Sequence, residues 1–296
     1  MKLAVIAHTE KQMGKAQPAD LRAALRDAGF PDPLWFEVAK SKLAPKCARK
    51  AAKAGVDRLL VWGGDGTVRR CIDTIADPDL PDIPIGILPA GTANLLASSL
   101  HIPTGMDEAL KIALHGERRV LDVGVINGER FAVMAGTGFD ALLIGGADTH
   151  KDRFGRLAYI WAGLRASGTD AVRARIKVDG TRWFDGPAGC LLVGNVGTIM
   201  GGLEVFPDAR PNDGRLEVGV VTAHRRDQWL RVFGRLVGHH PQRSPFVRTT
   251  SGTKIRVQLD RPMAYELDGG DRPPADHFRI DIQPAAITIL APPSAH

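Results

Sequence analysis

Short apolar runs alternate with helical stretches over the first 120 residues of this chain, and this alternation limits the fold more than any other feature. The apolar runs predict strands over residues 3–7, 34–38, 59–62 and 83–88. The stretches between and after them predict helices over residues 18–28, 43–54, 67–76, 93–100 and 106–114. Strands that alternate with helices are typical of a parallel sheet covered on both faces, so we predict an N-terminal α/β domain.

The pattern changes near residue 120, where strand and turn signals begin to follow one another directly. Residues 120–126 and 130–135 flank Asn127-Gly128, a pair that supplies the two positive φ angles of a type I′ hairpin turn. Further strands are predicted over residues 172–178, 190–193, 216–221, 255–259 and 278–282, and helices over residues 156–166 and 227–237. We therefore predict a second, larger and mainly antiparallel β domain.

Composition restricts the location and the partners. The three cysteines lie far apart without metal-ligand spacing, which favours a reducing cytosol. The apolar run at 3–7 is too short for a signal-peptide core, and no later run approaches the roughly 18–20 residues of a membrane span. A formal charge of +6 favours an anionic partner: a nucleotide, a nucleic acid or an acidic membrane surface. A nucleic acid is the weakest of these, because there is no binding motif and only 6% of residues are aromatic.

The strongest local motif is the run Gly63-Gly64-Asp65-Gly66-Thr67, between a predicted strand and a predicted helix. Glycines permit positive φ and a close approach of backbone to ligand, and N–H groups at a helix N-terminus bind phosphate. Asp65 is suited to holding Mg²⁺ or to accepting a proton from an attacking hydroxyl. The alternative is a tight strand-to-helix turn capped by this aspartate. A Walker A loop is excluded, since no Gly-Lys-Ser/Thr follows.

A second motif, Pro89-Ala90-Gly91-Thr92-Ala93-Asn94, also follows a predicted strand and precedes a helix. Gly91, the Thr92 hydroxyl and the Asn94 amide are candidates for contacts with phosphate or ribose. A threonine that merely caps a helix is the alternative. Three cations near the motifs, Lys15, Arg69 and Arg70, either face the phosphates or are simply solvated.

GGDGT followed by PAGTAN resembles the catalytic signature of bacterial diacylglycerol kinases, sphingosine kinases and ceramide kinases, and more distantly that of NAD kinases. The likeness continues in order through residues 121–124, 135–141, 151–158, 209–214 and 268–269. The resemblance implies transfer of the γ-phosphate of ATP to a lipid hydroxyl, with ATP in a cleft between two domains. The domains would be an α/β nucleotide-binding domain, residues 1–120 rejoined by a C-terminal strand at 285–296, and a lipid-binding β-sandwich, residues 121–284.

The family pattern also implies roles for individual residues. Asp65 and Asp122 would be catalytic and hold the metal, while Asp140 would lie near the lipid headgroup. Asp213 would belong to a second Mg²⁺ site, with a plain Asp-Gly turn as the alternative. The nucleotide would contact His8, Gly63, Gly64, Gly66, Thr67, Gly91, Thr92 and Asn94. ATP and Mg²⁺ are the expected cofactors.

The chain departs from the family pattern at several positions. The first loop runs from His8 to Lys15 without the usual Asn-Pro, and Arg69-Arg70 and Leu95 replace an Asn-Glu pair and an Asp. Gly270 stands where the family has a catalytic Glu. Asp271 is the predicted substitute and Glu266 the other candidate, although one of two such residues on a strand would face away.

Membrane contact is expected from a cationic stripe on the second predicted helix, with an ordinary solvated face as the alternative. Lys46, Arg49, Lys50 and Lys53 fall at helical spacing, with Lys40 and Lys42 before them, opposite Leu43, Cys47 and Ala54. Apolar segments at 157–164 and 229–237 are candidates for core packing or for an acyl-chain site.

The expected partners are ATP and a lipid substrate at the membrane surface, with a homodimer possible and no nucleic acid. We expect a cytoplasmic protein, peripheral at the inner membrane face. Two other functions stay open from the sequence. One is a kinase for a soluble acceptor such as NAD, and the other is a catalytically weak nucleotide- or lipid-binding protein.

Overall fold

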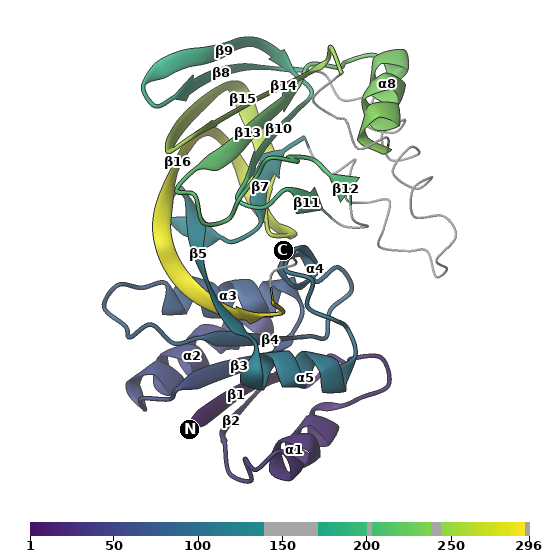
Figure 1. Cartoon of the computed structure of the whole chain (residues 1–296). Coiled ribbons are helices and arrows are strands. Elements are labelled where there is room, and N and C mark those ends of the chain that lie inside the picture. The colour runs from purple at the N-terminus through teal and green to yellow at the C-terminus, as the bar shows by residue number, and fades with distance from the viewer. Residues whose placement is uncertain (139–170, 200–202, 238–243, 294–296) are drawn as a thin grey trace. The chain divides into compact units, whose positions relative to one another are not determined.

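The computed structural model describes residues 1–138, 171–199, 203–237 and 244–293 (Figure 1). The chain divides into two compact units. One comprises Met1–Val123 and Pro284–His296, and the other comprises Gly124–Gln283. The predicted fold class is confirmed, because the first unit has a parallel sheet with helices and the second is rich in antiparallel strands.

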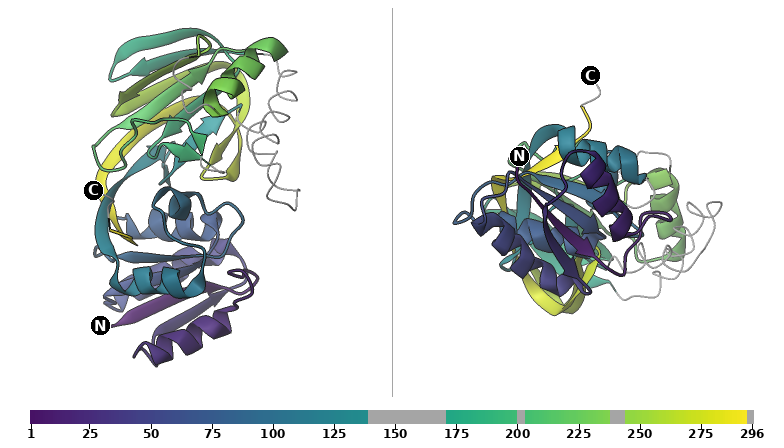
Figure 2. Two further views of the ribbon diagram at one scale, coloured as in Figure 1. Left: turned by 45° about the vertical axis from the view of Figure 1, so that its right-hand side comes forward. Right: turned by 90° about the horizontal axis from the view of Figure 1, so that it is seen from below.

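The first unit is built on the parallel strands β1 (Leu3–His8), β2 (Leu34–Val38), β3 (Arg58–Gly63) and β4 (Ile85–Pro89) in the order β4-β3-β1-β2. Residues of β1 and β4 are buried throughout, as expected where helices cover both faces. The helices are α1 (Pro18–Asp27), α2 (Ala44–Lys53), α3 (Asp65–Ile75), the single-turn α4 (Leu95–Ser99) and α5 (Met106–His115). Figures 1 and 2 show α2 and α3 on one face of the sheet and α1 and α5 on the other.

The chain leaves the first unit along β5 (Glu117–Ile126) and returns along β16 (Gly270–Ala291). On its return β16 adds a parallel strand beside β4, with Ile289 opposite Ile85. The buried carboxylate of Asp122 on β5 accepts a hydrogen bond from the N–H of Ala285 on β16 at 2.8 Å. This contact fastens the outgoing strand to the incoming strand within the first unit.

The second unit contains β6 (Glu129–Phe131), β7 (Met134–Thr137), β8 (Val172–Val178), β9 (Thr181–Ala188), β10 (Cys190–Gly194), β13 (Leu216–Val221), β14 (Val247–Gly252) and β15 (Lys254–Leu267). The strand order β14-β13-β10-β7-β15-β16 is antiparallel throughout, and the β8–β9 hairpin pairs with β15. A short ladder of β11 (Thr198–Ile199) and β12 (Leu203–Glu204) and helix α8 (Arg226–Val237) complete its described elements. Its core is apolar and includes Phe131, Ile176, Val218, Ile255 and Phe278.

Two-residue turns fix the hairpins of the second unit. Asn127 and Gly128 have φ of 49° and 91°, so the predicted type I′ turn is confirmed. Asp179 and Gly180 repeat these values between β8 and β9, at 49° and 84°. A third such turn, Asp268-Gly269, joins β15 to β16 with φ of 44° and 74°.

Several sequence predictions need correction. The buried face of α2 consists of Ala44, Ala48, Ala51 and Ala52, whereas Leu43, predicted to lie opposite the cations, is 47% exposed. The strand predicted over 130–135 is divided between β6 and β7, and β9 and β14 were not predicted. The predicted helix over 156–166 lies outside the described residues.

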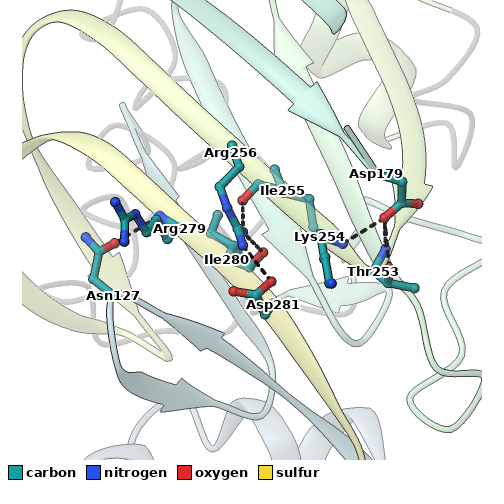
Figure 3. Close-up of polar contacts among 9 residues, drawn as sticks. All are labelled: Asn127, Asp179, Thr253, Lys254, Ile255, Arg256, Arg279, Ile280 and Asp281. Atoms are coloured by element: carbon teal, nitrogen blue, oxygen red, sulfur yellow. Dashed lines mark hydrogen bonds and ion pairs between the residues drawn. The ribbon is translucent and has the colours of Figure 1, made fainter. Parts of the chain in front are cut away.

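Asp268 is buried, and its carboxylate accepts three backbone hydrogen bonds, from Ala132, Val133 and Met134, each at 2.9 Å. Asp179 makes a similar set of contacts at the surface. Its Oδ1 accepts hydrogen bonds from the N–H and hydroxyl of Thr253 and from the N–H of Lys254 (Figure 3).

These two aspartates give a matched pair of variants. We expect Asp268→Ala to lower the free energy of unfolding by about 3 kcal/mol, because buried N–H groups lose their acceptor without gaining water. Asp179→Ala should cost at most about 1 kcal/mol, because water replaces the lost carboxylate at an exposed turn. Urea unfolding of both variants measures the difference, and equal losses would contradict the structural role given to Asp268.

Candidate functional site

The first candidate loop lies where β3 ends at Gly63 and α3 begins at Asp65. The carbonyl of Gly64, the N-cap residue, accepts hydrogen bonds from the N–H groups of Thr67 at 2.9 Å and Val68 at 3.1 Å. Gly64 itself is extended, with φ of −89° and ψ of −175°, and none of the loop glycines has positive φ. The expectation that positive φ explains these glycines is therefore wrong. Glycine is needed here because other atoms pack too closely for a Cβ.

Close packing joins this loop to the second one. A Cβ on Gly64 would lie 3.1 Å from the Cα of Gly91, and a Cβ on Gly91 would lie 2.5 Å from the Cα of Gly64. The N–H of Ala90 also donates to the carbonyl of Gly63 at 3.0 Å. The two loops follow the neighbouring parallel strands β3 and β4, so they meet at the carboxyl edge of the sheet, where open α/β sheets bind ligands.

The second loop is closed by its own asparagine. Oδ1 of Asn94 accepts the N–H of Gly91 at 2.9 Å, and the Asn94 amide donates to the Gly91 carbonyl at 2.8 Å. Asn94 has φ of 46°, in the left-handed region, and is the N-cap of α4. Its side chain therefore shapes the loop, while Thr92 between them is exposed.

Asp65 connects the two loops through its side chain. Its Oδ1 accepts a hydrogen bond from the N–H of Leu95 at 2.5 Å, so a residue of the first loop holds the start of α4. Burial raises the pKa of Asp65 above its usual value, and hydrogen bonds from the backbone of Leu95 and Asn94 oppose this only in part. The carboxylate is half-buried, which suits a group that both supports a loop and meets a ligand.

Thr67 has a structural position beneath the first loop. It is buried, and its hydroxyl lies 3.0 Å from that of Ser41, in the short helix η1 (Ser41–Leu43) that precedes α2. A Cβ on Gly63 would lie 2.7 Å from the Cβ of Thr67, so a glycine is needed there. Gly66 is exposed on the first turn of α3.

His8 lies at the carboxyl end of β1, the neighbour of β3. It is buried, and its Nδ1 accepts the N–H of Glu10 at 3.4 Å. Burial lowers the pKa of His8, Lys11 lowers it further, and Glu10 acts in the opposite direction. Neutral imidazole is therefore favoured. The indole N–H of Trp62 on β3 donates to the Lys11 carbonyl at 2.9 Å and ties this loop to the same edge.

The cations named with the motifs have different surroundings. Arg69 is buried, with 6% of its surface exposed, so its guanidinium is not an open phosphate contact. Arg70 is half-buried and Lys15 is exposed. Asp122 also belongs to the first unit, but it is buried and bonded to Ala285.

The candidate carboxylates near Gly270 lie in the second unit. Glu266 and Asp271 are directly opposite one another across the β15–β16 hairpin, so their side chains share a face. The expectation that one must face away is wrong, because the turn at Asp268-Gly269 puts them on two strands. Asp271 is exposed. Arg272 next to it donates to the Gly270 carbonyl at 3.1 Å and pairs with Glu129 at 2.7 Å.

Asp213 lies in an exposed Asx turn, where its Oδ1 accepts the N–H of Arg215 at 2.9 Å. Within the described ranges no three His, Cys, Asp or Glu residues are grouped as metal ligands. Asp140, the candidate for headgroup contact, and the apolar segment 157–164 lie outside the described residues. In the other apolar stripe, Trp229 and Val232 are buried, which agrees with core packing.

Sequence reasoning missed Ser41 and the role of Asp268. Nothing in the local sequence around Ser41 indicates a partner 26 residues away. For Asp268 a signal was present, since Asp-Gly between two alternating apolar runs is typical of a hairpin turn.

The sequence of the chain was compared with those of known proteins, and both units match known domain families. Residues 2–126 match the model of the diacylglycerol kinase catalytic domain, and residues 133–291 match the YegS C-terminal NAD kinase beta sandwich-like domain. The "Probable lipid kinase YegS-like" of Enterobacter sp. (strain 638) is 30% identical over 255 residues, 84% of this chain and 83% of that protein. "Lipid kinase YegS" of Escherichia coli K12 is also 30% identical, with the same shares covered.

The chain belongs to the diacylglycerol kinase catalytic-domain family, together with the YegS lipid kinases. Membership of this family makes it a phosphotransferase of the lipid kinase type that uses a nucleotide.

Solved structures share the fold. A putative diacylglycerol kinase from Bacillus anthracis has a TM-score of 0.81 at 20% identity, covering 98% of this chain and 97% of that one. An NAD kinase from Archaeoglobus fulgidus, solved in complex with ATP, has a TM-score of 0.52 at 13% identity, covering 98% and 93%. None of the helices in the described part of this lipid kinase chain has the length and apolar character needed to cross a bilayer.

The glycine contact between the loops can be tested by adding one methyl group. We expect Gly91→Ala to destabilise the protein by about 1–3 kcal/mol, because the new Cβ meets backbone at 2.5 Å. Gly66→Ala is the matched control. Its Cβ would meet only the side chain of Ser41, with Oγ at 3.7 Å and Cβ at 4.0 Å, so stability should be unchanged or up to about 1 kcal/mol higher. Thermal unfolding measures the stability of both variants. If Gly91→Ala were as stable as Gly66→Ala, the close contact between the two loops would be contradicted.

Proposed function

We propose that this protein transfers the γ-phosphate of ATP to the hydroxyl of a membrane lipid, diacylglycerol or a closely related molecule. The observation that carries the proposal is the junction of the two loops. Backbone contact between Gly64 and Gly91 and the hydrogen bond from Leu95 to Asp65 make one site from two motifs. The family membership supports the same reaction class.

The junction suits a polyphosphate. The first N–H groups of α3 lie at the N-terminus of an 11-residue helix and favour an anion there. Glycines at 63, 64 and 91 leave the backbone without side chains over it, so phosphate oxygens can approach it closely. Thr67, Thr92, Asn94 and the neutral His8 complete the proposed nucleotide site.

Asp65 is the proposed centre of the chemistry. A carboxylate whose pKa is raised by burial accepts a proton from a hydroxyl more readily than an exposed one. Carboxylate oxygens are also the ligands that Mg²⁺ prefers, so the half-buried Asp65 fits this ion. Asp122, which is buried and accepts the N–H of Ala285, is the second proposed ligand. When bound, Mg²⁺ would neutralise negative charge on the phosphates. Asp271 is the proposed third catalytic carboxylate, and Asp213 and Asp140 stay predictions for a second metal site and the headgroup.

Asp65→Asn separates the chemical role of the carboxylate from its support of the loop. The Asn amide oxygen can still accept from Leu95, so the fold should persist while transfer falls by roughly 10²–10⁴-fold. Because the folded pKa of Asp65 is raised, ionisation destabilises the fold as pH rises through that pKa. Asp65→Asn should therefore be more stable than the wild type at neutral pH, and the difference should shrink in acid.

The measurements are labelled-ATP transfer and urea unfolding between about pH 4 and pH 8, a range that starts near the usual pKa of aspartate. Asp32→Asn, the same change at an exposed site outside the helices, is the control and should leave the transfer rate and the stability unchanged. A variant at position 65 with the wild-type rate would show that the reaction does not use this carboxylate.

The acceptor is tested by offering labelled ATP with vesicles of diacylglycerol, ceramide, sphingosine or phosphatidylglycerol, and separately with NAD. We expect label in a lipid, with diacylglycerol first, and none in NAD. Label in NAD alone would establish the soluble-acceptor alternative. Tight ATP binding without transfer to any acceptor would establish the weak binding protein that Gly270 suggests. A cytoplasmic location, peripheral at the inner membrane face, belongs to the proposal, and a homodimer remains a prediction.

A further inference from the structure

One face of the sheet in the second unit is strongly cationic. Strand β8 alternates buried and exposed residues, so Ala174 and Ile176 face the core while Arg173, Arg175 and Lys177 face outward. The same alternation on β15 buries Ile255, Val257 and Leu259 and turns Lys254, Arg256 and Gln258 outward. The outward side chains of β9, β8, β15 and β16 make up what we term the cationic sheet face. Its cations are Arg173, Arg175, Lys177, Arg182, Lys254, Arg256 and Arg279.

The strand register places like charges directly beside each other. In the strand register, Arg182 on β9 lies opposite Lys177 on β8. Lys177 lies opposite Arg256 on β15, and Arg256 lies opposite Arg279 on β16. Neighbouring strands are about 4.8 Å apart, so these residues form one row of cations across four strands. Like charges directly opposite one another destabilise a sheet, and an anionic partner would relieve that repulsion.

Acidic residues neutralise this face only in part. Asp185 pairs with Arg173 at 2.8 Å and lies 3.9 Å from Arg175 and 3.7 Å from Arg182. Asp281 pairs with Arg256 at 2.9 Å, as Figure 3 shows. Asp260 is exposed further along β15.

Three cations take part in no such ion pair, although Asp281 lies opposite one of them, Lys254, in the register of β15 and β16. Within the part of the chain that the structure describes, no carboxylate lies in ion-pair distance of Lys177, Lys254 or Arg279. All three are exposed. The only polar contacts of Lys254 and Arg279 drawn in Figure 3 are made by their backbone N–H groups, to Asp179 and Asn127. The charged ends of these side chains are therefore available to a partner.

We propose that the cationic sheet face docks onto an anionic lipid bilayer. This inference rests on the proposed function, since a lipid kinase must reach a substrate that is held in a membrane. The charge of the face complements anionic headgroups, and each cation near an anionic leaflet strengthens binding severalfold. A sheet face is open and broad, whereas a site for a single phosphate ligand is concave with converging polar groups.

A single-stranded nucleic acid fits the same face less well. Single-stranded nucleic acids are bound by aromatic side chains that stack on the bases. The aromatic residues of β9 are not free for this, because Trp183 packs against the apolar core and Phe184 is buried within it. The bilayer is therefore the partner that the face favours.

The α2 stripe of the first unit provides a matched control for the test. Lys46, Lys50 and Lys53 are exposed on α2, as the residues of the sheet face are on their strands. The sheet variant carries Lys177→Gln, Lys254→Gln and Arg279→Gln, and the helix variant carries Lys46→Gln, Lys50→Gln and Lys53→Gln. Each variant removes the same amount of charge from a formal total of +6, so a general effect of net charge would weaken both equally.

The full chain is mixed with phosphatidylcholine vesicles that contain phosphatidylglycerol or lack it, and the bound fraction is measured by sedimentation without ATP. We expect the wild type to prefer the anionic vesicles and to lose this preference at high salt. The sheet variant should bind them about tenfold or more weakly. The helix variant should lose less than half of the binding. Thermal unfolding should show the sheet variant to be at least as stable as the wild type, since repulsion within the row is relieved.

Any of three results overturns the proposal: no preference of the wild type for anionic vesicles, equal losses in both variants, or a loss confined to the helix variant. A duplex DNA competitor whose binding depends on the sheet residues, while vesicle binding does not, would assign the face to nucleic acid instead. Because the assay contains no ATP, a failure of docking is distinguishable from a failure of phosphoryl transfer.

Discussion

The close contact of two glycine backbones, Gly64 and Gly91, is the constraint on which the rest of the candidate site depends. It can form only because neither residue has a Cβ, and it brings the ends of β3 and β4 together in one surface. Asp65 reinforces the junction by accepting the N–H of Leu95, and Asn94 closes the second loop on Gly91. Without this contact the two motifs would be separate turns, each with an ordinary structural explanation.

The aspartates of the chain illustrate how burial decides their use. Asp268 is buried with three N–H donors around its carboxylate, so it fixes a hairpin turn and the strand beside it. Asp122 is buried, and one of its oxygens already accepts the N–H of Ala285, so as the second proposed metal ligand it would also join the strands that leave and re-enter the first unit. Asp65 is only half-buried, and burial raises its pKa despite its backbone donors. A loop carboxylate whose ionised form is disfavoured by burial is more consistent with a catalytic role than with a purely structural one.

Much of this architecture could be predicted from the sequence because local rules govern it. The alternation of strands and helices predicted the parallel sheet of the first unit, and Asn127-Gly128 predicted the hairpin turn between β5 and β6. Long-range contacts could not be predicted. The glycines of the first loop are required by Gly91 and Thr67 rather than by positive φ, and Glu266 and Asp271 share a face because a turn lies between them. The cationic row is assembled from residues between 177 and 279, so only the strand register shows it. Leu43 was expected to lie on the side of the helix opposite the cations, but four alanines form the buried face of α2 and Leu43 is exposed.

The proposed nucleotide site at the joined loops is tested most directly by a crystal structure of the protein with ADP and Mg²⁺. We expect phosphate oxygens against the backbone N–H groups of residues 64–66, close to Gly91, with the metal ion beside the Asp65 carboxylate. A nucleotide bound at another place in the chain, with the contact between Gly64 and Gly91 unchanged and no ligand near it, would contradict it.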